Sequence, residues 1–432
     1  MTQKNIKIGI IGFGNVGQAT ADSLAANAEQ IKQRAGVGLQ VVAVCRRTPV
    51  PAKQLPAGVR LVKDWKQIVR DSSVDLVVET MGGTEDAREV VLGALESGKP
   101  VVTANKNLLA KYGHEIQALA AQKNIPVGIE AAVAGGVPVV RAITDGMTGD
   151  RLQAVYGILN GTTNYILTQM ESNGLSFEQA LSQAQKAGYA EPDPSSDVDG
   201  IDTRDKLCIL ARLAFHGWLP EDKIPTDGIR SIAAIDFCYA RMLKSTIRLI
   251  AYAELSKHGL EISVRPWLVH RRSMMAKAEG VNNAVFLVGE RIGRQMFYGP
   301  GAGPRATSTA VISDLVEIGR SMANGALRGR ELHGFQEMKP LPLAKTFSPA
   351  SWYLRLTVSD RPGILAHVAQ IISKAGMNID AVLQQPNMAK EQLSFVITVE
   401  PTPEPEIRKV VKEINKLDCL LQPVLLLRIA SE

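Results

Sequence analysis

The sequence predicts an α/β fold divided into three parts, and three features of the chain support this division. Residues 1–135 alternate short β-rich runs with helix-like segments. Residues 136–302 combine longer amphipathic helices with strands, and residues 351–432 run strand, helix, strand, strand, helix, strand. Domains average roughly 150 residues, so a chain of 432 residues has room for this arrangement.

The first part is predicted to be a parallel sheet covered by helices on both faces, because strands and helices alternate along the chain. Its strands are expected at 6–11, 41–45, 75–80, 100–103 and 126–130, with helices near 84–96 and 107–123. A glycine-rich turn at 299–303 precedes a helix over 308–321, and we expect a helix near 303–325 to complete this part.

The middle part is predicted to be an α+β domain for substrate binding and dimerisation. Its expected elements are helices over 176–187 and 202–216 and strands over 261–269 and 283–289. A stretch rich in Pro, Gly and polar residues, 330–350, indicates a linker. The third part follows the split βαβ, ferredoxin-like plan, with strands at 352–359, 393–399 and 423–429 and helices at 365–375 and 404–417.

The composition excludes several classes of protein. With 45% hydrophobic and 21% charged residues the chain is globular, and it has no apolar run of the ~18 residues that cross a membrane. The net charge of +6 comes from Lys and Arg interleaved with Asp and Glu, which argues against nucleic acid as a partner. The four scattered cysteines form no CxxC pair, so we expect reduced thiols, no zinc site and a cytoplasmic protein without a secretory leader.

Three glycines follow the first strand in the spacing G-x-G-x-x-G. Gly12 permits a tight turn, Gly14 lets the backbone approach a pyrophosphate, and Gly17 allows close packing of helix against strand. The N-terminus of the following helix supplies N–H groups and partial positive charge for phosphates. The spacing alone is common, but its place between a strand and a helix predicts a Rossmann-type dinucleotide-binding domain.

The end of the second strand bears on the choice of cofactor. NAD sites usually place an acid there to bind the ribose 2′-OH, whereas this chain has Arg46 and Arg47. Two guanidinium groups favour the 2′-phosphate of NADP. The alternative is that both arginines lie on a solvated loop, and dual use of NAD and NADP stays open.

Two later loops begin where strands end, the position at which ligands collect in open α/β sheets. One begins at Thr80, and the other contains Thr103 and Lys106. From spacing alone, Lys106 is equally compatible with a cation that meets the ligand and with one on the surface of a first helical turn.

A helix from near Asp199 through Phe215 would place Asp202 and Lys206, four residues apart, on one face. Beyond Lys206 the segment is apolar on almost every side, so this helix is predicted to be buried, where unpaired charge is costly. The pair is either a proton-handling lysine held by an aspartate, with Glu191 and Asp197 as anchors for an ammonium group, or a surface ion pair worth about 0.3–0.5 kcal/mol.

Two further segments carry weaker signals. Residues 157–167 gather Asn and Thr before an apolar helix, which suits either a small polar ligand or a helix cap. Residues 130–138 offer the carboxylate of Glu130 and backbone carbonyls that could surround an alkali cation, but a plain turn is the simpler explanation.

Taken together, the segments at 12–17, 103–106, 131–138, 157–167 and 190–210 resemble those of bacterial homoserine dehydrogenases. Residues 354–379 resemble an ACT domain, the amino-acid-sensing module of the longer form of that family. The resemblance covers nearly the whole chain. It implies reversible, NAD(P)-dependent interconversion of L-homoserine and L-aspartate 4-semialdehyde, on the branch that leads to threonine and methionine.

The resemblance also assigns roles to residues. Lys206 is similar to the acid/base lysine of the family, with Lys106 near the nicotinamide and substrate. The implied cofactor residues are Gly12, Phe13, Gly14, Asn15, Val16, Gly17, Thr80, Thr103 and Gly303, and the implied substrate residues are Gly188, Glu191, Asp197 and Asp202. A structural sodium ion is implied at Glu130 and the backbone of Val133, Gly135 and Val137.

The ACT-like part implies feedback by an amino acid, with threonine as the expected effector at Asp360, Gly363, Asn378 and Ile379. A homodimer or homotetramer is expected, and the alternative is an ACT-like part that only dimerises the enzyme. Two rival functions stay open, a dehydrogenase of the same architecture acting on aspartate and a redox-inactive sensor that binds nucleotide and amino acid.

Overall fold

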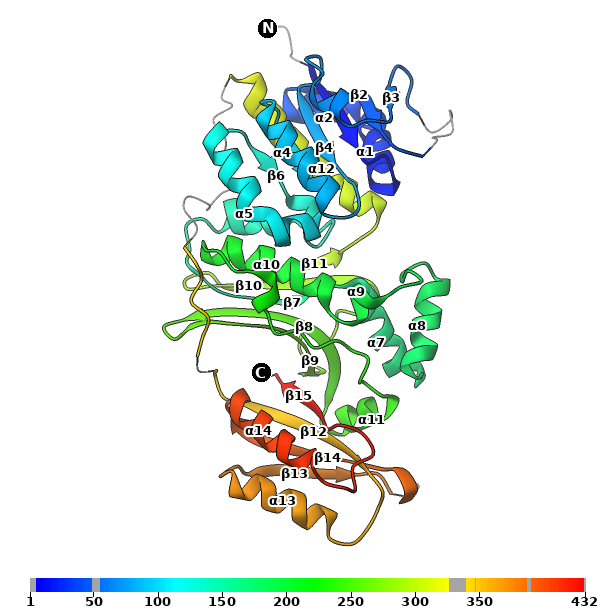
Figure 1. The fold of residues 1–432 in the computed structure, drawn as a ribbon, viewed down its shortest axis with the longest axis vertical. Coiled ribbons are helices and arrows are strands. Elements are labelled where there is room, and N and C mark those ends of the chain that lie inside the picture. The colour runs from blue at the N-terminus through cyan, green and yellow to red at the C-terminus, as the bar shows by residue number, and fades with distance from the viewer. Residues whose placement is uncertain (1–4, 49–54, 326–338, 346, 387–389, 431–432) are drawn as a thin grey trace. The chain divides into compact units, whose positions relative to one another are not determined.

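The computed structural model describes residues 5–48, 55–325, 339–345, 347–386 and 390–430 (Figure 1). The chain forms two compact units and passes between them several times, so neither unit is one continuous segment. The first consists of Met1–Asn160, Asp202–Ile224 and Asn282–Leu341, and the second of Gly161–Ile201, Pro225–Val281 and Pro342–Glu432.

A six-stranded sheet forms the N-terminal part of the first unit, in the order β3-β2-β1-β4-β5-β6. Every pairing in it is parallel. This is the order of a dinucleotide-binding Rossmann sheet, which confirms the predicted fold class. The strands are β1 (Asn5–Ile11), β2 (Gly38–Cys45), β3 (Arg60–Val62), β4 (Leu76–Glu79), β5 (Val101–Thr103) and β6 (Val127–Gly128).

The helices of this part bury apolar faces against the sheet. They are α1 (Asn15–Ala26), α2 (Ala28–Ala35), α3 (Lys66–Val69), α4 (Glu85–Glu96), α5 (Lys106–Lys123) and α12 (Pro304–Ala323). Although α12 comes late in the chain, its Val311, Leu315 and Ile318 share one core with the isoleucines of β1, and Figure 1 shows it among the N-terminal helices. It begins at Pro304, earlier than the predicted 308, because Pro suits the first turn of a helix.

The first unit also contains the antiparallel strands β7 (Leu152–Ile158), β10 (Asn282–Gly289) and β11 (Gly293–Pro300). Helix α10 (Ile201–Phe215) starts later than the predicted Asp199, because Asp199 ends the short helix α9 (Ser195–Val198) and Gly200 adopts φ +82°. Four short helical segments complete this unit, η2 (Glu130–Ala132), α6 (Val139–Arg141), η3 (Ala142–Gly146) and η4 (Glu221–Lys223).

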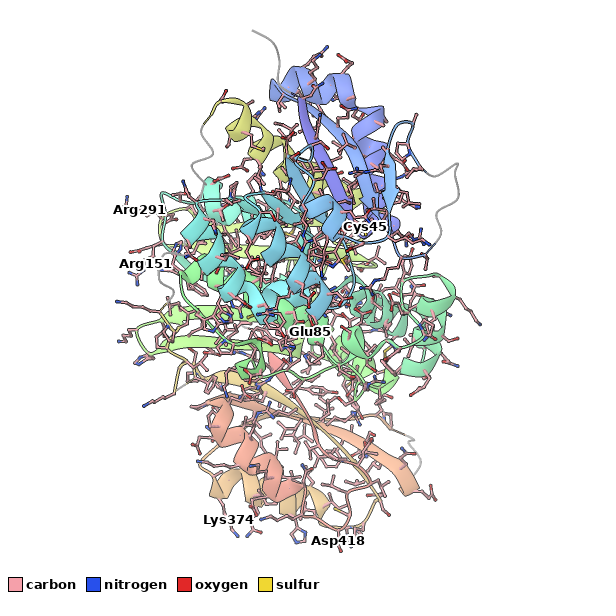
Figure 2. All side chains as sticks on the ribbon, turned by 45° about the horizontal axis from the view of Figure 1, so that its top comes forward. Cys45, Glu85, Arg151, Arg291, Lys374 and Asp418 are labelled. Carbon is pink, nitrogen blue, oxygen red and sulfur yellow. The ribbon has the colours of Figure 1, made fainter. Side chains whose placement is uncertain are left out.

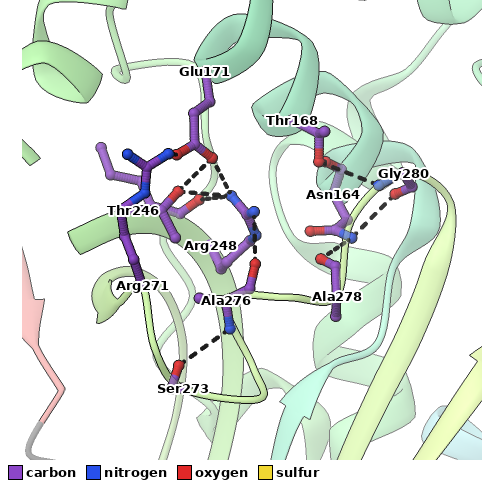
Figure 3. A network of polar contacts seen from close by, with 11 residues as sticks. Asn164, Thr168, Glu171, Thr246, Arg248, Arg271, Ser273, Ala276, Ala278 and Gly280 are labelled. Carbon is purple, nitrogen blue, oxygen red and sulfur yellow. Dashed lines mark hydrogen bonds and ion pairs between the residues drawn. The ribbon is translucent and has the colours of Figure 1, made fainter. Parts of the chain in front are cut away.

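The second unit begins with helices α7 (Gly161–Asn173) and α8 (Phe177–Lys186), and also contains α11 (Ala234–Met242) and the long hairpin of β8 (Ser245–Ser256) and β9 (Gly259–His270). Figure 3 shows the polar network that fixes α7. Glu171 of α7 binds Arg248 and Thr246 of β8, and the amide of Asn164 donates to the carbonyls of Ala278 and Gly280. Asn164 of the 157–167 segment therefore anchors the first turns of α7.

The C-terminal part of the second unit has the predicted ferredoxin-like plan. Its sheet has the order β15-β12-β14-β13, with two helices and a core of its own. The elements are β12 (Ala350–Val358), α13 (Ile364–Lys374), β13 (Ile379–Gln384), η5 (Lys390–Gln392), β14 (Leu393–Thr402), α14 (Glu404–Ile414) and β15 (Leu425–Ile429). Strand β15 also pairs in parallel with β9, so this sheet continues into the β8–β9 hairpin.

The linker predicted over 330–350 lies partly outside the described residues. Within the described part, Pro340 forms an isolated bridge with Trp218 and Leu343 one with Leu260, so this stretch makes backbone contacts in both units. The predicted domain boundaries stay a prediction. None of the helices in the described ranges is both long and apolar enough to cross a bilayer.

Candidate active site

The glycine turn between β1 and α1 has the geometry that its spacing predicts. Gly12 adopts φ +99°, and its carbonyl accepts a hydrogen bond of 2.7 Å from the hydroxyl of Thr80. A Cβ on Gly17 would lie 2.5 Å from the carbonyl oxygen of Gly12, so only glycine lets α1 approach this closely. A Cβ on Gly14 would meet nothing within 4 Å, which leaves its backbone accessible to a ligand.

A pocket of about 320 Å³ opens beside this turn. It is lined by Phe13, Gly14 and Thr80, and by Arg46 and Arg47, the two arginines predicted to bind the coenzyme. These two arginines directly follow Cys45, which ends β2 and is labelled in Figure 2. Arg47 forms an ion pair of 2.5 Å with Asp86, and Arg46 donates to the hydroxyl of Thr48 at 2.8 Å.

Several residues that line this pocket were not predicted from the sequence, among them Lys63 and Trp65. Lys63 and Trp65 follow β3 and line the same pocket. Since β3 is a parallel strand next to β2, the rule that ligands collect at the carboxyl ends of strands would have found them, had this three-residue strand been predicted. The pocket therefore contains a third cation and an aromatic ring.

The other predicted cofactor residues are distributed around the sheet. Asn15 and Val16 are the first residues of α1, and Gly303 precedes α12 with φ +108°. Thr103 is fully buried at the end of β5, and its hydroxyl donates to the carboxyl group of Glu79. Contacts of these residues with a cofactor stay a prediction.

Two lysines from different elements of the first unit meet one aspartate. Asp202 and Lys206 lie in successive turns of α10, and their side chains are 2.7 Å apart (Lys206 Nζ to Asp202 Oδ2). Lys106, at the start of α5, places its Nζ 3.0 Å from the other oxygen, Asp202 Oδ1. The alternative of a surface ion pair is wrong, because both members of the Asp202–Lys206 pair are more than 90% buried.

Asp202 is held in its ionised form. Burial alone would raise the pKa of its carboxyl group, but the ammonium groups of Lys206 and Lys106 and the amide of Asn160 outweigh burial and hold the pKa below its usual value. Lys206 Nζ also donates to the carbonyl of Leu159 at 2.9 Å, and this carbonyl accepts a second bond from the amide of Asn283. The carboxylate thus fixes both lysine side chains in place.

Asn160 and Asn283 are further residues that the sequence reasoning did not single out. Asn160 donates to Asp202 at 2.8 Å from the end of the β7 segment, and Asn283 lies in β10. Asn160 belongs to the 157–167 segment, whose cluster of Asn and Thr was the available signal. Asn283 gave none, since a single Asn in a strand is common.

The remaining predicted substrate residues belong to the second unit. Glu191 is exposed in the loop after α8, and Asp197 is half-buried in α9. Gly188 ends α8 with φ +76°. The acidic run at 190–210 is therefore divided, with Asp202 and Lys206 in the first unit and the earlier acids in the second.

Glu130 lies in a buried polar cluster. Its carboxyl oxygens accept from the backbone N–H groups of Val140 and Arg141, and its own N–H donates to Asp314 at 2.9 Å. Burial raises the pKa of Glu130 to about 7, although these hydrogen bonds and the charge of Arg141 oppose the rise. In the described ranges no three His, Cys, Asp or Glu side chains gather as a metal site would require.

The predicted effector residues lie on the loops of the ferredoxin-like part. Asp360 is exposed after β12, and Gly363 precedes α13 with φ +94°. Asn378 donates to the carboxylate of Glu400 at 3.0 Å, and Ile379 begins β13. These side chains therefore flank the two ends of α13.

Comparison with known proteins agrees with this geometry. The model of the homoserine dehydrogenase NAD-binding domain matches residues 12–130, and the homoserine dehydrogenase model matches residues 138–316. A homoserine dehydrogenase of Pseudomonas aeruginosa is 38% identical over 434 residues, which cover 99% of each chain. This chain belongs to the homoserine dehydrogenase family.

The remaining matches extend the homoserine dehydrogenase relationship. Residues 354–422 match the model of an AHAS small subunit-like ACT domain, which confirms the predicted ACT domain. The crystal structure of a homoserine dehydrogenase from Thiobacillus denitrificans has a TM-score of 0.93 at 37% identity and covers 100% of both chains. A hyperthermophilic archaeal homoserine dehydrogenase in complex with NADPH has a TM-score of 0.62 at 27% identity, over 72% of this chain and 97% of that one. The predicted NAD(P)-dependent oxidoreductase is confirmed.

Proposed function

We propose that this chain catalyses the reversible oxidation of L-homoserine to L-aspartate 4-semialdehyde, in threonine and methionine biosynthesis. The observation that carries the proposal is the buried contact of Asp202 with Lys206 and Lys106, in a chain of this family. A nicotinamide coenzyme, when bound, supplies the hydride acceptor or donor. The open backbone at Gly14 and the cationic pocket beside it fit such a group.

The two lysines handle the proton in this proposal. During reduction of the aldehyde, the ammonium group of Lys206 donates a proton to the developing alkoxide and becomes a neutral amine. During oxidation, the neutral amine of Lys206 accepts the proton of the homoserine hydroxyl and becomes an ammonium group again, with the ammonium group of Lys106 beside it. Asp202 holds both side chains in place. From the resemblance to the family, Gly188, Glu191, Asp197 and Asp202 are assigned to substrate binding, and carboxylates such as those of Glu191 and Asp197 suit the ammonium group of homoserine.

NADP is the proposed coenzyme, with NAD as a second substrate. Arg46, Arg47 and Lys63 line one pocket, and three cations suit a 2′-phosphate better than a free hydroxyl. Glu130 and the carbonyls of Val133, Gly135 and Val137 are the proposed sodium ligands. Support comes from their chemistry, since oxygen donors suit a hard cation and a cation would offset the burial of Glu130.

The ACT domain is proposed to bind an amino-acid effector, with threonine as the feedback inhibitor. A homodimer or homotetramer in the cytoplasm completes the proposal, and the four free cysteines fit a reducing compartment.

One assay tests these assignments. Reduced nicotinamide is followed by absorbance with homoserine or aspartate as substrate and with NADP or NAD as coenzyme, then repeated with threonine. The proposal expects turnover of homoserine only, a lower KM for NADP than for NAD, and inhibition by threonine. Turnover of aspartate instead, or coenzyme binding without turnover, would contradict the enzymatic assignment, whereas loss of threonine inhibition alone would contradict only the effector.

A further inference from the structure

Glu79 is a buried acid that the proposed reaction does not use. It is the last residue of β4, and its side chain has no exposed surface. One carboxyl oxygen accepts from the backbone N–H of Met81 at 2.6 Å, and the other accepts from the hydroxyl of Thr103 at 2.5 Å. A single side chain therefore binds the loop after β4 and the end of β5.

The contact continues from Thr103 to the start of α5. The hydroxyl of Thr103 accepts from the backbone N–H of Asn105 at 3.0 Å, and the amide of Asn105 donates to the carbonyl of Gly83 at 2.8 Å. Asn105 also caps α5, since its side-chain oxygen accepts from the N–H of Leu108. The loops at 80–83 and 103–106 are thus joined at two points.

Both loops carry parts of the candidate site. Thr80, Met81 and Gly82 line the dinucleotide pocket. Lys106 is the first residue of α5, directly after the cap, and reaches Asp202 from there. Any shift of the Thr103–Asn105 segment moves the backbone of Lys106.

Burying a carboxyl group at this position costs free energy of folding, so its presence indicates a compensating role. Burial raises the pKa of Glu79 to about 7, although hydrogen bonds from Thr103, Met81 and Asn105 oppose the rise. An apolar side chain would pack here without that cost, but it could not accept hydrogen bonds from two loops at once.

We propose that Glu79 is a positioning residue, which joins the two loops through Met81 and Thr103 and thereby holds Lys106 in contact with Asp202. This inference rests on the proposed function, in which Lys106 meets the substrate. Glu79 itself contacts neither substrate nor coenzyme.

The test compares Glu79→Gln and Glu79→Ala with changes at its partner. A glutamine side chain keeps one acceptor oxygen for Met81, but its NH2 group can only donate to the hydroxyl of Thr103, so this hydrogen bond is reversed and weakened in Glu79→Gln and removed in Glu79→Ala. We expect kcat for homoserine to fall by about 10- to 100-fold, because displacing a catalytic group by about 1 Å has an effect of this size. In Glu79→Gln, which keeps the acceptor for Met81, the Kd for NADPH should change less than kcat. Thr103→Val, which removes the hydroxyl that donates to Glu79, should act in the same direction.

Val77→Ala is the matched control. Val77 is fully buried on the same face of β4, two residues before Glu79, and takes no part in the polar contacts. This variant should lose stability but keep kcat. A fall of kcat in Val77→Ala equal to that in Glu79→Gln would mean that packing alone explains the effect.

Two measurements separate positioning from a general loss of structure. In a double-mutant cycle, Glu79→Gln should have little further effect in a Lys106→Met background, because both changes act on the same group. Crystal structures of Glu79→Gln and Glu79→Ala should show the Lys106–Asp202 contact lengthened or lost. The inference is overturned if that contact is intact in both variants, or if the two effects on kcat multiply. If the wild-type chain does not oxidise homoserine, the proposed function fails, and the crystal structures still decide the positioning role.

Discussion

At the scale of single residues, the candidate site depends on which charges are paired and which are not. Asp202 is buried among two ammonium groups and an amide, which together outweigh burial and hold the pKa of its carboxyl group below the usual value. Glu79 is equally buried but is bound only by hydrogen-bond donors in the described structure. The same side-chain chemistry thus serves to hold cations in one place and to join loops in the other.

Replacing Lys206 by Met should lower kcat by about 100-fold or more, because the proton of the substrate hydroxyl loses its acceptor. Lys106 and Asn160 still bind Asp202 in this variant, so the chain should fold. Steady-state rates and circular dichroism would check both statements. Lys111→Met removes an exposed lysine from the next turn of α5 and should leave kcat unchanged. A near-normal rate in folded Lys206→Met would refute the assignment.

Glu79 also predicts a pH dependence of stability. Its pKa is about 7 in the folded chain against 4.5 for an unperturbed Glu, so the folded state binds this proton more tightly. Binding of this proton therefore adds its full contribution to the free energy of unfolding below pH 4.5, and this contribution is lost as the pH rises through 7. Glu79→Gln should remove about 3 kcal/mol of this dependence, measured by chemical denaturation between these limits. An unchanged pH profile in the variant would show that Glu79 does not titrate in this range.

At the scale of elements, two glycines in the turn from β1 to α1 differ in the space around them. At Gly12 a Cβ would lie 2.5 Å from the carbonyl carbon of Thr80, in a backbone conformation with φ +99°. At Gly14 the space is open. We therefore expect Gly12 to matter for folding and Gly14 for the approach of a ligand.

Gly12→Ala should therefore lower the melting temperature, whereas Gly14→Ala should keep it and weaken NADPH binding by about 10-fold or more, since a methyl group blocks the approach to the backbone. Thermal unfolding and fluorescence titration with NADPH would measure these effects. Gly36→Ala is the control for the effect of a positive φ on stability without any steric clash, because Gly36 has φ +71° and a Cβ there would meet nothing within 4 Å. A Gly14→Ala variant that binds NADPH as tightly as wild type would exclude this turn as the pyrophosphate site.

The positions of the helices and strands agree with the sequence prediction in some places and differ in others. Strands β1, β4 and β5 and helices α4 and α5 lie where hydrophobic patterns predicted them, because buried parallel strands are apolar runs next to clear breaks. The short strand β3 was missed, because it includes a charged residue and only one of its three residues is buried, and the pocket residues Lys63 and Trp65 were missed with it. Helix α10 begins at Ile201, within one residue of the predicted range 202–216, whereas a start near Asp199 is excluded because Gly200 adopts φ +82°.

At the scale of the whole molecule, the ACT domain is part of the second unit rather than an appended module. Besides the β15–β9 pairing, a buried ion pair joins it to α11. Arg355 of β12 lies 2.7 Å from Asp236, whose side chain also accepts from the hydroxyl of Tyr353. Asp236 has no exposed surface, so its charge depends on this arginine.

Replacing Arg355 by Met should destabilise the chain by about 3–5 kcal/mol, because it leaves a buried carboxylate without its cation. Thermal unfolding of the full chain would measure the loss. Adding Asp236→Asn should restore much of it, since the amide removes the charge but keeps the hydrogen-bonding groups. If the double variant were no more stable than Arg355→Met, the arginine would contribute through packing alone.

The sequence by itself determined the fold class and the family, and it predicted which residues bind and react, because hydrophobic periodicity, glycine spacing and the family's motifs can be recognised in short stretches of the chain. Only the tertiary structure decided that Lys106 reaches the Asp202–Lys206 pair, that Lys63 and Trp65 line the dinucleotide pocket, and that Glu79 joins two loops. These contacts connect residues far apart in the chain. Their energies depend on burial and on distances of about 3 Å between donor and acceptor atoms, which only the packing of the elements sets.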